Sequence, residues 1–360
     1  MTQGEQLYIE GKLEEGRPVL AAEAKEGNGR ALYCLGQYEL FGLLGAERPA
    51  EAAALFHRGA ADPLARLMEA LFLRPGAADG DAVKDALAAA EAEGAAGNAN
   101  ALFARSAVFW AGLDGLVEKD GETARACCEK AADLGFWQAE MEMGLHFLNG
   151  QYVEKNGEKG AALMKRAAEK GVGKAEYHLA YCLLAGVGVE KNPSLAVSYY
   201  QKALRHGYVR AAVELGVYYE TDLYVRQDKK KACQLFKKAA EKGDADGKAH
   251  LADGLLDGSA GKRSSRKAAE LYAEAARGGS AYAVLRLGEL AFSRGDEGTA
   301  FRYFHDAARL GLPAAQYLAG LCLLQGRGVA PDRKAASVWL RQAAQSGSRE
   351  AAQLLMQAGL

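Results

Sequence analysis

The chain contains 360 residues, of which 49% are hydrophobic and 25% charged, and its 45 basic side chains nearly balance 46 acidic ones to leave a formal net charge of -1. This composition excludes an intrinsically disordered chain, because disorder combines low hydrophobicity with high net charge. It also provides no overall positive field, so we expect neither nucleic acid nor an anionic membrane surface as a partner.

The N-terminal segment is polar and acidic, with no apolar run behind a basic stretch. We therefore expect no cleaved secretory signal, and no part of the chain approaches the roughly 18 apolar residues of a membrane span. The cysteines do not recur as regularly spaced pairs, which argues against a disulfide framework. A reducing cytoplasm is the expected location, while secretion by a route without a cleaved signal stays open.

From residue 28 onward the sequence repeats itself about every 36 residues. The segments 174–207 and 314–347 align without a gap over their whole length. Each repeat is closed by a residue that is nearly always glycine, at Gly27, Pro63, Gly97, Gly135, Gly171, Gly207, Gly243, Gly279, Gly311 and Gly347. We expect nine repeats in 28–347, a capping half repeat in 1–27 and a short cap in 348–360.

Each repeat has the pattern of two amphipathic helices. In the first, an alanine, an apolar residue and a small residue share one face, as in Ala211, Leu215 and Gly216. The small residue allows the partner helix to approach closely. The second helix carries an apolar pair between two alanines, such as Leu235 and Phe236.

The start of each second helix is marked by a residue whose side-chain oxygen can accept from the free N–H groups of a first helical turn. These predicted caps are Asp120, Asn156, Asn192, Asp228, Ser264, Asp296 and Asp332. Pro193 then follows at a first helical position, where its missing N–H costs nothing. The closing glycines suit a left-handed residue after the second helix.

The complete pattern, A-x-Y-x-L-G/A…G-x-G-V…(D/N)-x-x-x-A…(W/Y/F)…A-A-x-x-G, is carried by Ala175, Tyr177, Leu179, Ala180, Gly186, Gly188, Val189, Asn192, Ala196, Tyr200, Ala203 and Gly207. It resembles the Sel-one-like repeat (SLR) family, a relative of the tetratricopeptide repeat. The resemblance implies an all-α fold, a right-handed α/α superhelical solenoid of about nine 36-residue helix-turn-helix repeats. The alanine-rich repeat 64–97 should pack least well, so we expect a soft joint at 75–98. The repeat 280–311 is shorter than the others.

By similarity to tetratricopeptide arrays, the first helices line a concave groove that binds a peptide or helix. The predicted contacts are Phe103, Trp110, Met141, Leu145, Tyr177, Tyr181, Leu184, Arg210, Val217, Phe292, Tyr317 and Leu321. Aromatic residues with a polar tip are common binding hot spots. Tyr177 and Tyr317 alternatively belong to the repeat pattern and only pack between helices. Arg210, like Arg30 and Lys174, either clamps a ligand carboxylate or is a solvated charge on the rim.

No catalytic or metal-binding group stands out against the repeat. His146 and Cys182 occupy equivalent positions in successive repeats, and Cys127 and Cys128 take core positions of a second helix. The loop 186–189 precedes a helix, but no strand precedes it and no Lys-Ser/Thr follows, so we interpret it as a turn and not as a phosphate loop. We expect no metal and no cofactor.

The leading hypothesis is a non-enzymatic scaffold or adaptor for an unidentified protein or peptide partner. A second hypothesis is an enzyme, because some cysteine-rich relatives in the family are assigned β-lactam binding or hydrolysis. Those relatives carry a regular disulfide pair in each repeat, which this chain does not. A third is self-assembly into a homo-oligomer through Leu354, Leu355 and Met356 of the C-terminal cap.

Overall fold

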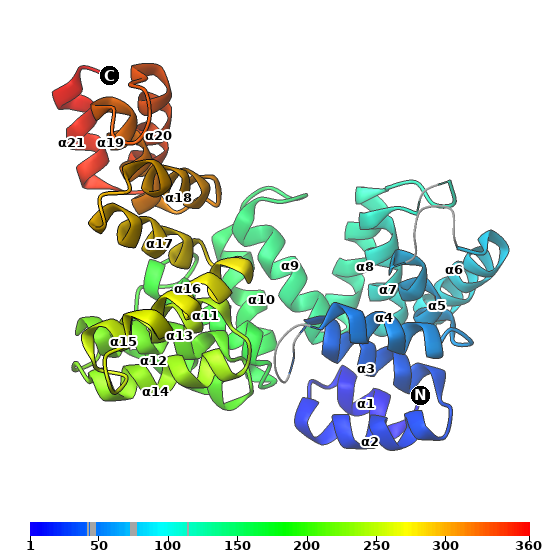
Figure 1. Ribbon diagram of the computed structural model, residues 1–360. Coiled ribbons are helices and arrows are strands. Elements are labelled where there is room, and N and C mark those ends of the chain that lie inside the picture. The colour runs from blue at the N-terminus through cyan, green and yellow to red at the C-terminus, as the bar shows by residue number, and fades with distance from the viewer. Residues whose placement is uncertain (42, 44–47, 73–77, 114) are drawn as a thin grey trace. The chain divides into compact units, whose positions relative to one another are not determined.

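The computed structural model of the protein describes residues 1–41, 43, 48–72, 78–113 and 115–360. These residues contain no β-strand, and their helices follow one another in pairs joined by short loops (Figure 1). The chain divides into two compact units, Met1–Ala211 and Ala212–Leu360. The prediction of an all-α helical-repeat solenoid is confirmed. Over the described residues, no helix is both long and apolar enough to cross a lipid bilayer.

The first unit consists of six helix pairs, each with a first and a second helix. The pairs are α1 (Gln3–Ile9) and α2 (Leu13–Lys25), α3 (Gly29–Phe41) and α4 (Pro49–Arg58), α5 (Pro63–Phe72) and α6 (Gly80–Ala95), α7 (Ala99–Ala111) and α8 (Gly121–Asp133), α9 (Trp137–Asn149) and α10 (Gly157–Glu169), and α11 (Gly173–Ala185) and α12 (Pro193–Arg205).

The N-terminal segment 1–27 forms the complete pair α1 and α2, where the sequence predicts half a repeat. Gly11 separates the two helices with a φ of 79°, a backbone conformation that side chains other than glycine rarely adopt. Its N–H donates to the Tyr8 carbonyl at 3.1 Å and ends α1. The predicted soft joint lies partly at 75–77, outside the described residues, and the rest of it is mostly α6.

The second unit repeats the same arrangement. Its helices are α13 (Arg210–Thr221), within which the unit begins, and α14 (Lys229–Glu241), α15 (Ala245–Asp257) and α16 (Ser265–Arg277), α17 (Ala281–Ser293) and α18 (Glu297–Arg309), α19 (Pro313–Gln325) and α20 (Arg333–Gln345), and the single helix α21 (Arg349–Ala358). In α21, Leu354 and Leu355 pack against the cluster of Leu340 and Ala343, whereas Met356 is 75% exposed.

All seven predicted caps accept hydrogen bonds from the first turn of their second helix. Asp228 is one example, because its side chain accepts from the Lys231 N–H at 2.9 Å. The closing glycines are confirmed as well, since Gly97, Gly243 and Gly347 have φ values of 90°, 89° and 95°. Local side-chain chemistry therefore fixes where the second helices begin and where they end.

The small residue of a first helix lies directly against a large residue of its partner. A Cβ atom on Gly288 would lie 2.7 Å from the Phe304 ring, and one on Gly320 would lie 2.7 Å from Leu340 Cγ. Gly216 faces the ring of Phe236 in the same way. This confirms the close approach that the sequence predicts, and it buries one large side chain in each of these pairs.

The glycine-rich loop is a turn that also touches the preceding repeat. Gly188 has a φ of 68°, and a Cβ atom there would overlap the backbone carbonyl of Gly157 at the start of α10. Gly328 meets the Glu297 carbonyl in the same way at the start of α18. The second loop glycine therefore serves both the turn and the stacking of neighbouring pairs.

Candidate functional site

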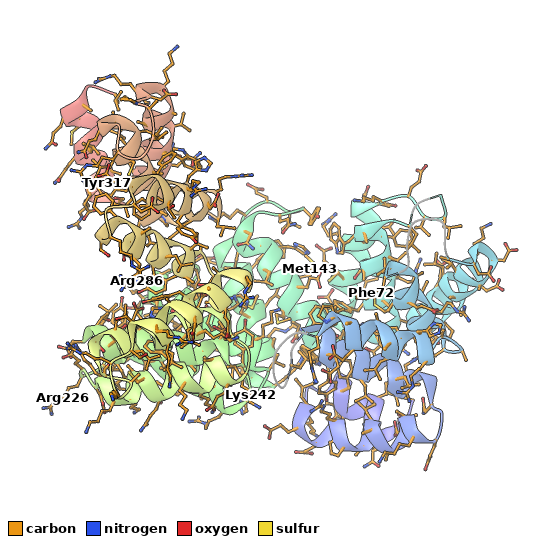
Figure 2. The ribbon with its side chains drawn as sticks, viewed as in Figure 1. Phe72, Met143, Arg226, Lys242, Arg286 and Tyr317 are labelled. Atoms are coloured by element: carbon orange, nitrogen blue, oxygen red, sulfur yellow. The ribbon has the colours of Figure 1, made fainter. Side chains whose placement is uncertain are left out.

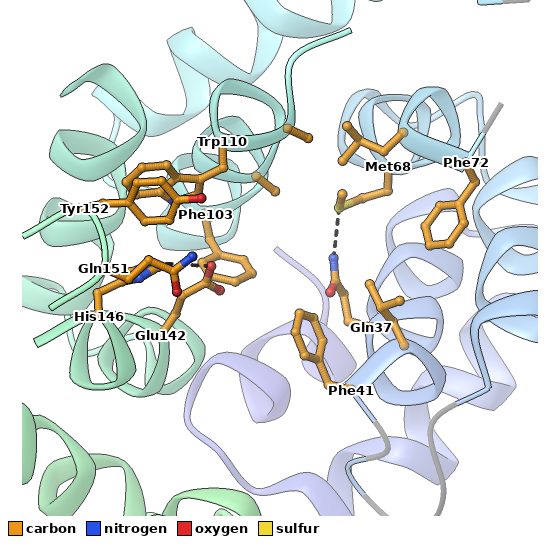
Figure 3. A pocket seen from close by; sticks show the side chains of 14 residues that line it. Gln37, Phe41, Met68, Phe72, Phe103, Trp110, Glu142, His146, Gln151 and Tyr152 are labelled. Atoms are coloured by element: carbon orange, nitrogen blue, oxygen red, sulfur yellow. Dashed lines mark hydrogen bonds and ion pairs between the residues drawn. The ribbon is translucent and has the colours of Figure 1, made fainter. Parts of the chain in front are cut away.

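Four successive first helices, α3, α5, α7 and α9, surround one cavity of about 520 Å³ in the first unit (Figure 3). We call it the first-unit pocket. It is lined by Gln37, Leu40, Phe41, Met68, Leu71, Phe72, Phe103, Ala107, Trp110, Ala111, Glu142, His146, Gln151 and Tyr152. Most of these side chains are apolar or aromatic, as is usual for ligand-binding cavities.

One wall of the pocket is a stack of aromatic rings. The Trp110 and Tyr152 rings lie 4.2 Å apart between centroids, and the His146 ring lies 5.2 Å from each of them. Met68 and Phe72 stand on the opposite side of the cavity (Figure 3). The pocket therefore offers flat aromatic faces on one side and a more flexible apolar surface on the other.

Tyr152 is held in an unusual backbone conformation. Its φ is 63°, and it occupies the loop position that Gly188 fills in the next repeat. A side chain other than glycine pays about 1–2 kcal/mol for this left-handed conformation. This conformation places the Tyr152 ring, which is 58% exposed, over the Trp110 ring.

The aromatic wall contains polar atoms without a hydrogen-bond partner among the described residues. They are the Trp110 Nε1 donor and both ring nitrogens of His146, a residue only 8% exposed. The Glu142 carboxylate lies 3.8 Å from His146 Nε2, which is too long for a hydrogen bond. Native proteins pair the great majority of their buried polar atoms, so this group of atoms is an exception.

Burial changes the protonation of both titratable groups in this wall. It raises the pKa of Glu142 to about 7, although Lys174 of α11 acts in the opposite direction. Burial also lowers the pKa of His146 below its ordinary value. At neutral pH the imidazole is therefore largely uncharged, and Glu142 exchanges its proton readily.

Helix α1 contacts helix α9 next to Gln37, one of the residues that line the pocket. The Trp137 indole N–H donates to the Tyr8 carbonyl at 2.7 Å, and the Tyr8 hydroxyl donates to Gln138 Oε1 at 2.6 Å. Gln37 accepts a long contact of 3.4 Å from Gln138 and donates to Met68 Sδ at 3.2 Å. The first pair of the chain thus contacts the fifth pair, and Gln37 links this contact to the pocket.

An ion-pair network includes Glu5 of α1, the helix that contacts α9. Arg30 donates to Glu5 Oε1 at 2.8 Å, to Asp62 Oδ2 at 2.9 Å and to Glu93 Oε1 at 2.9 Å. The Asn100 amide also donates to Glu5 at 3.2 Å. Arg30 is neither a clamp for a ligand carboxylate nor a solvated charge on the rim. Its guanidinium pairs with carboxylates of the protein, and its side chain is only 13% exposed.

The second unit contains a comparable carboxylate that is fully engaged. Asp253 accepts from the hydroxyls of Tyr272 and Tyr282 at 2.6 and 2.8 Å and pairs with Arg286 Nη2 at 2.8 Å. Arg286 is labelled in the second unit in Figure 2. Asp253 and Arg286 therefore find partners within this cluster. Among the described residues, Trp110 Nε1 and the ring nitrogens of His146 in the first-unit pocket have no hydrogen-bond partner.

A family model described as the Sel1 repeat matches seven consecutive segments, 99–136, 137–172, 173–208, 209–244, 245–280, 281–312 and 313–348. The chain belongs to the Sel1 repeat family. Proteins of this family are generally protein-interaction scaffolds, and the family is typically non-enzymatic. The match begins at α7, but the earlier pairs from α3 to α6 share the same helical arrangement.

A similar solved structure supports the Sel1 repeat fold. The crystal structure of c5321, a protective antigen of uropathogenic Escherichia coli with an SLR fold, is 26% identical, with a TM-score of 0.56 over 96% of this chain and 76% of that chain. A Sel1 repeat protein from Oxalobacter formigenes is 21% identical, with a TM-score of 0.49 over 95% of this chain and 89% of that chain. The comparison with curated proteins finds no match.

Two of the predicted contact residues line the first-unit pocket of this Sel1 repeat protein, namely Phe103 and Trp110. Met141 is only 3% exposed and packs in the core, so it offers little surface to a partner. Leu145 is half-buried on the same helix and does not line the pocket. Of the four contacts predicted on α7 and α9, two line the pocket and two do not.

The contacts predicted on α11 are not gathered in this pocket. The Tyr177 ring lies 5.3 Å from Tyr200 and 5.1 Å from Tyr208, so it packs between helices. Tyr181 is 57% exposed and Leu184 is half-buried. The packing alternative therefore describes Tyr177, while Tyr181 is accessible.

The remaining predicted contacts are spread along the later repeats. Arg210 is exposed, and Val217 and Leu321 are half-buried. Phe292 is 37% exposed beneath the Arg327 guanidinium, 5.6 Å above its ring. Tyr317 packs against the C-terminal cluster that includes Leu340 and is labelled in Figure 2.

Sequence reasoning missed the part of the lining that comes from the first two repeats, because it took no apolar contacts from them. Those repeats supply Phe41, Met68 and Phe72. A signal existed for Tyr152, since a tyrosine replaces the loop glycine of the repeat at that position. The cysteines predicted to fill the core, Cys127 and Cys128, are indeed buried.

Proposed function

We propose that this Sel1 repeat protein is a non-enzymatic scaffold that holds an extended segment of a partner protein in the first-unit pocket. The general role of the family as protein-interaction scaffolds supports this proposal. The first-unit pocket is the place that we assign to the bound segment. Its volume of about 520 Å³ suits one or two side chains of a bound segment. Phe103 and Trp110 would contact that segment together with Phe41, Phe72 and Tyr152.

The observation that carries this proposal is that the indole N–H of Trp110 and the adjacent imidazole of His146 have no hydrogen-bond partner among the residues that the structure describes. A peptide backbone provides both carbonyl acceptors and N–H donors, so it can satisfy the two side chains together. Aromatic residues in desolvated pockets are also the usual hot spots of protein interfaces. The strained backbone at Tyr152 further supports a role in binding, because such strain is concentrated at functional sites.

The proposal is tested with a library of randomised acetylated heptapeptides on beads, probed with the intact, fluorescently labelled protein. Trp110→Ala should weaken binding to the selected peptides by at least about 30-fold, the effect of removing a hot-spot residue. Tyr152→Gly should also weaken binding without unfolding the protein, because glycine accepts the left-handed backbone. Unchanged affinity in both variants contradicts the proposal.

A matched control is available in the second unit. Tyr224 occupies the same loop position as Tyr152 and has a φ of 65°, but it does not line the first-unit pocket. Tyr224→Gly should therefore leave peptide binding unchanged. The double variant Trp110→Ala with Tyr181→Ala asks whether the segment continues along α11, in which case it binds more weakly than Trp110→Ala alone.

A further inference from the structure

We infer that the first-unit pocket receives a lysine or arginine side chain of the bound segment, with its cationic head beside Glu142 and His146. This inference rests on the proposed function and adds the chemistry of the partner.

Once Glu142 has lost its proton, the described lining of the pocket carries a net negative charge. Among its described lining residues, Glu142 is the one carboxylate, and neither a lysine nor an arginine is present. Lys174 of α11 lies outside the lining, with its ammonium 5.8 Å from the centre of the Phe41 ring. A cationic ligand therefore complements the pocket, whereas an anionic ligand would be repelled by it.

Other glutamates buried in the first unit already have a cation or an imidazole in hydrogen-bond range. Glu140 pairs with Arg166 at 2.8 Å and with Lys170 at 2.7 Å. Glu176 pairs with His206 at 2.7 Å. Corresponding partners hold Glu5, Glu39 and Glu69. Within the described part of the chain, Glu142 instead lies 3.8 Å from His146, beyond hydrogen-bond range, although its side chain is only 30% exposed.

The surrounding residues fit the rest of such a side chain. A neutral His146 has one ring nitrogen that accepts a hydrogen bond, so Glu142 and His146 together offer acceptors to an ammonium or guanidinium group. The Trp110 and Tyr152 rings provide faces for a cation–π contact. Phe41, opposite them, lines the path of the aliphatic stem (Figure 3).

The titration of Glu142 gives the inference a second signature. The groups that face it are His146 on α9, Tyr152 in the following loop, Cys128 on α8 and Lys174 on α11. Its pKa of about 7 means that a cation binds best once the carboxyl has lost its proton. Binding of a lysine peptide should therefore tighten by up to about tenfold between pH 6 and pH 8.

The test compares three bead-displayed libraries of acetylated heptapeptides that differ only in a fixed central residue: lysine, norleucine or glutamate. Norleucine keeps the aliphatic stem and removes the charge. The intact protein should prefer the lysine library over the norleucine library by about tenfold or more at pH 8, and the preference should shrink at pH 6. Glu142→Gln should abolish both effects, whereas Glu154→Gln, an exposed control with the same change in charge, should keep them.

The outcomes separate the two proposals. Equal binding of the lysine and norleucine libraries, or preference for glutamate, overturns the cation inference and leaves the scaffold proposal standing. Absence of any binding above that of Trp110→Ala overturns both. If Glu142→Gln fails to fold, as circular dichroism would show, the pH dependence of the unaltered protein decides, and weaker lysine binding at pH 8 than at pH 6 refutes the inference.

Discussion

Replacing Glu142 by glutamine should stabilise the protein at pH 8 and change its stability much less at pH 5. The reason is that burial raises the pKa of this carboxyl from 4.5 to about 7. The folded protein therefore binds a proton more tightly at Glu142 than the unfolded chain does. The stability contribution of Glu142 falls as the pH rises from about 4.5 to about 7, because the unfolded chain releases the proton first.

The size of the effect follows from the two pKa values. The difference between 4.5 and about 7, at about 1.4 kcal/mol for each pKa unit, sets an upper limit of about 3.5 kcal/mol. Water reaches 30% of the Glu142 side chain and screens its charge, so we expect about 2 kcal/mol between pH 5 and pH 8. Glutamine has nearly the same shape as glutamate and does not ionise. The Glu142→Gln variant should therefore not lose this stability as the pH rises from 5 to 8.

Urea denaturation of both proteins at pH 5 and pH 8, followed by far-UV circular dichroism and tryptophan fluorescence, measures the difference. Other groups titrate equally in the two proteins, so subtracting one stability from the other isolates Glu142. Glu154→Gln serves as the control and should track the unaltered protein at both pH values. A variant that is equally stabilised at both pH values, or destabilised at pH 8, refutes the assigned environment of Glu142.

Three further changes test the packing. Gly97→Ala meets only the cost of a left-handed backbone, about 1 kcal/mol, because nothing lies within 4 Å of the added carbon. Gly188→Ala also overlaps a backbone carbonyl and should cost more than about 3 kcal/mol in urea unfolding; equal costs contradict the contact between repeats. Arg30→Met, which leaves three carboxylates without their cation, should cost about 3–5 kcal/mol, against less than about 1 kcal/mol for the half-exposed Arg17→Met. Asp228→Ala should lower stability by about 1 kcal/mol through its lost cap, and an unchanged thermal midpoint argues against that cap.

The helix pairs could be predicted well because their determinants are local. Asp228 accepts from an N–H group three residues away, and the closing glycines end the helix they follow. The position of Gly216 against Phe236 also recurs in every repeat that has this pair of residue types. Period, caps and small residues are all visible in the linear pattern, so the sequence alone is sufficient for the repeat architecture.

The pocket could not be predicted in the same way, because it depends on contacts between distant repeats. A solenoid with only nearest-neighbour contacts leaves its first helices open along one continuous groove. Here residues of α3, α5, α7 and α9 line one cavity, and Tyr8 of α1 donates to Gln138 of α9 across 130 positions of the chain. The surroundings of Glu142 and Trp110 depend on how several repeats pack together, which their residue types alone do not show.

The contact between α1 and α9 also has a consequence for synthesis on the ribosome. Tyr8 leaves the ribosome long before Gln138, which follows it by 130 residues. At about 5–20 residues per second, that delay is roughly 6–26 seconds. During this interval α1 can pack on α2 and α3 but has no access to Trp137, so the packing of the first helix is completed only after α9 has emerged. A chaperone that binds emerging apolar segments has a defined period in which to hold α1.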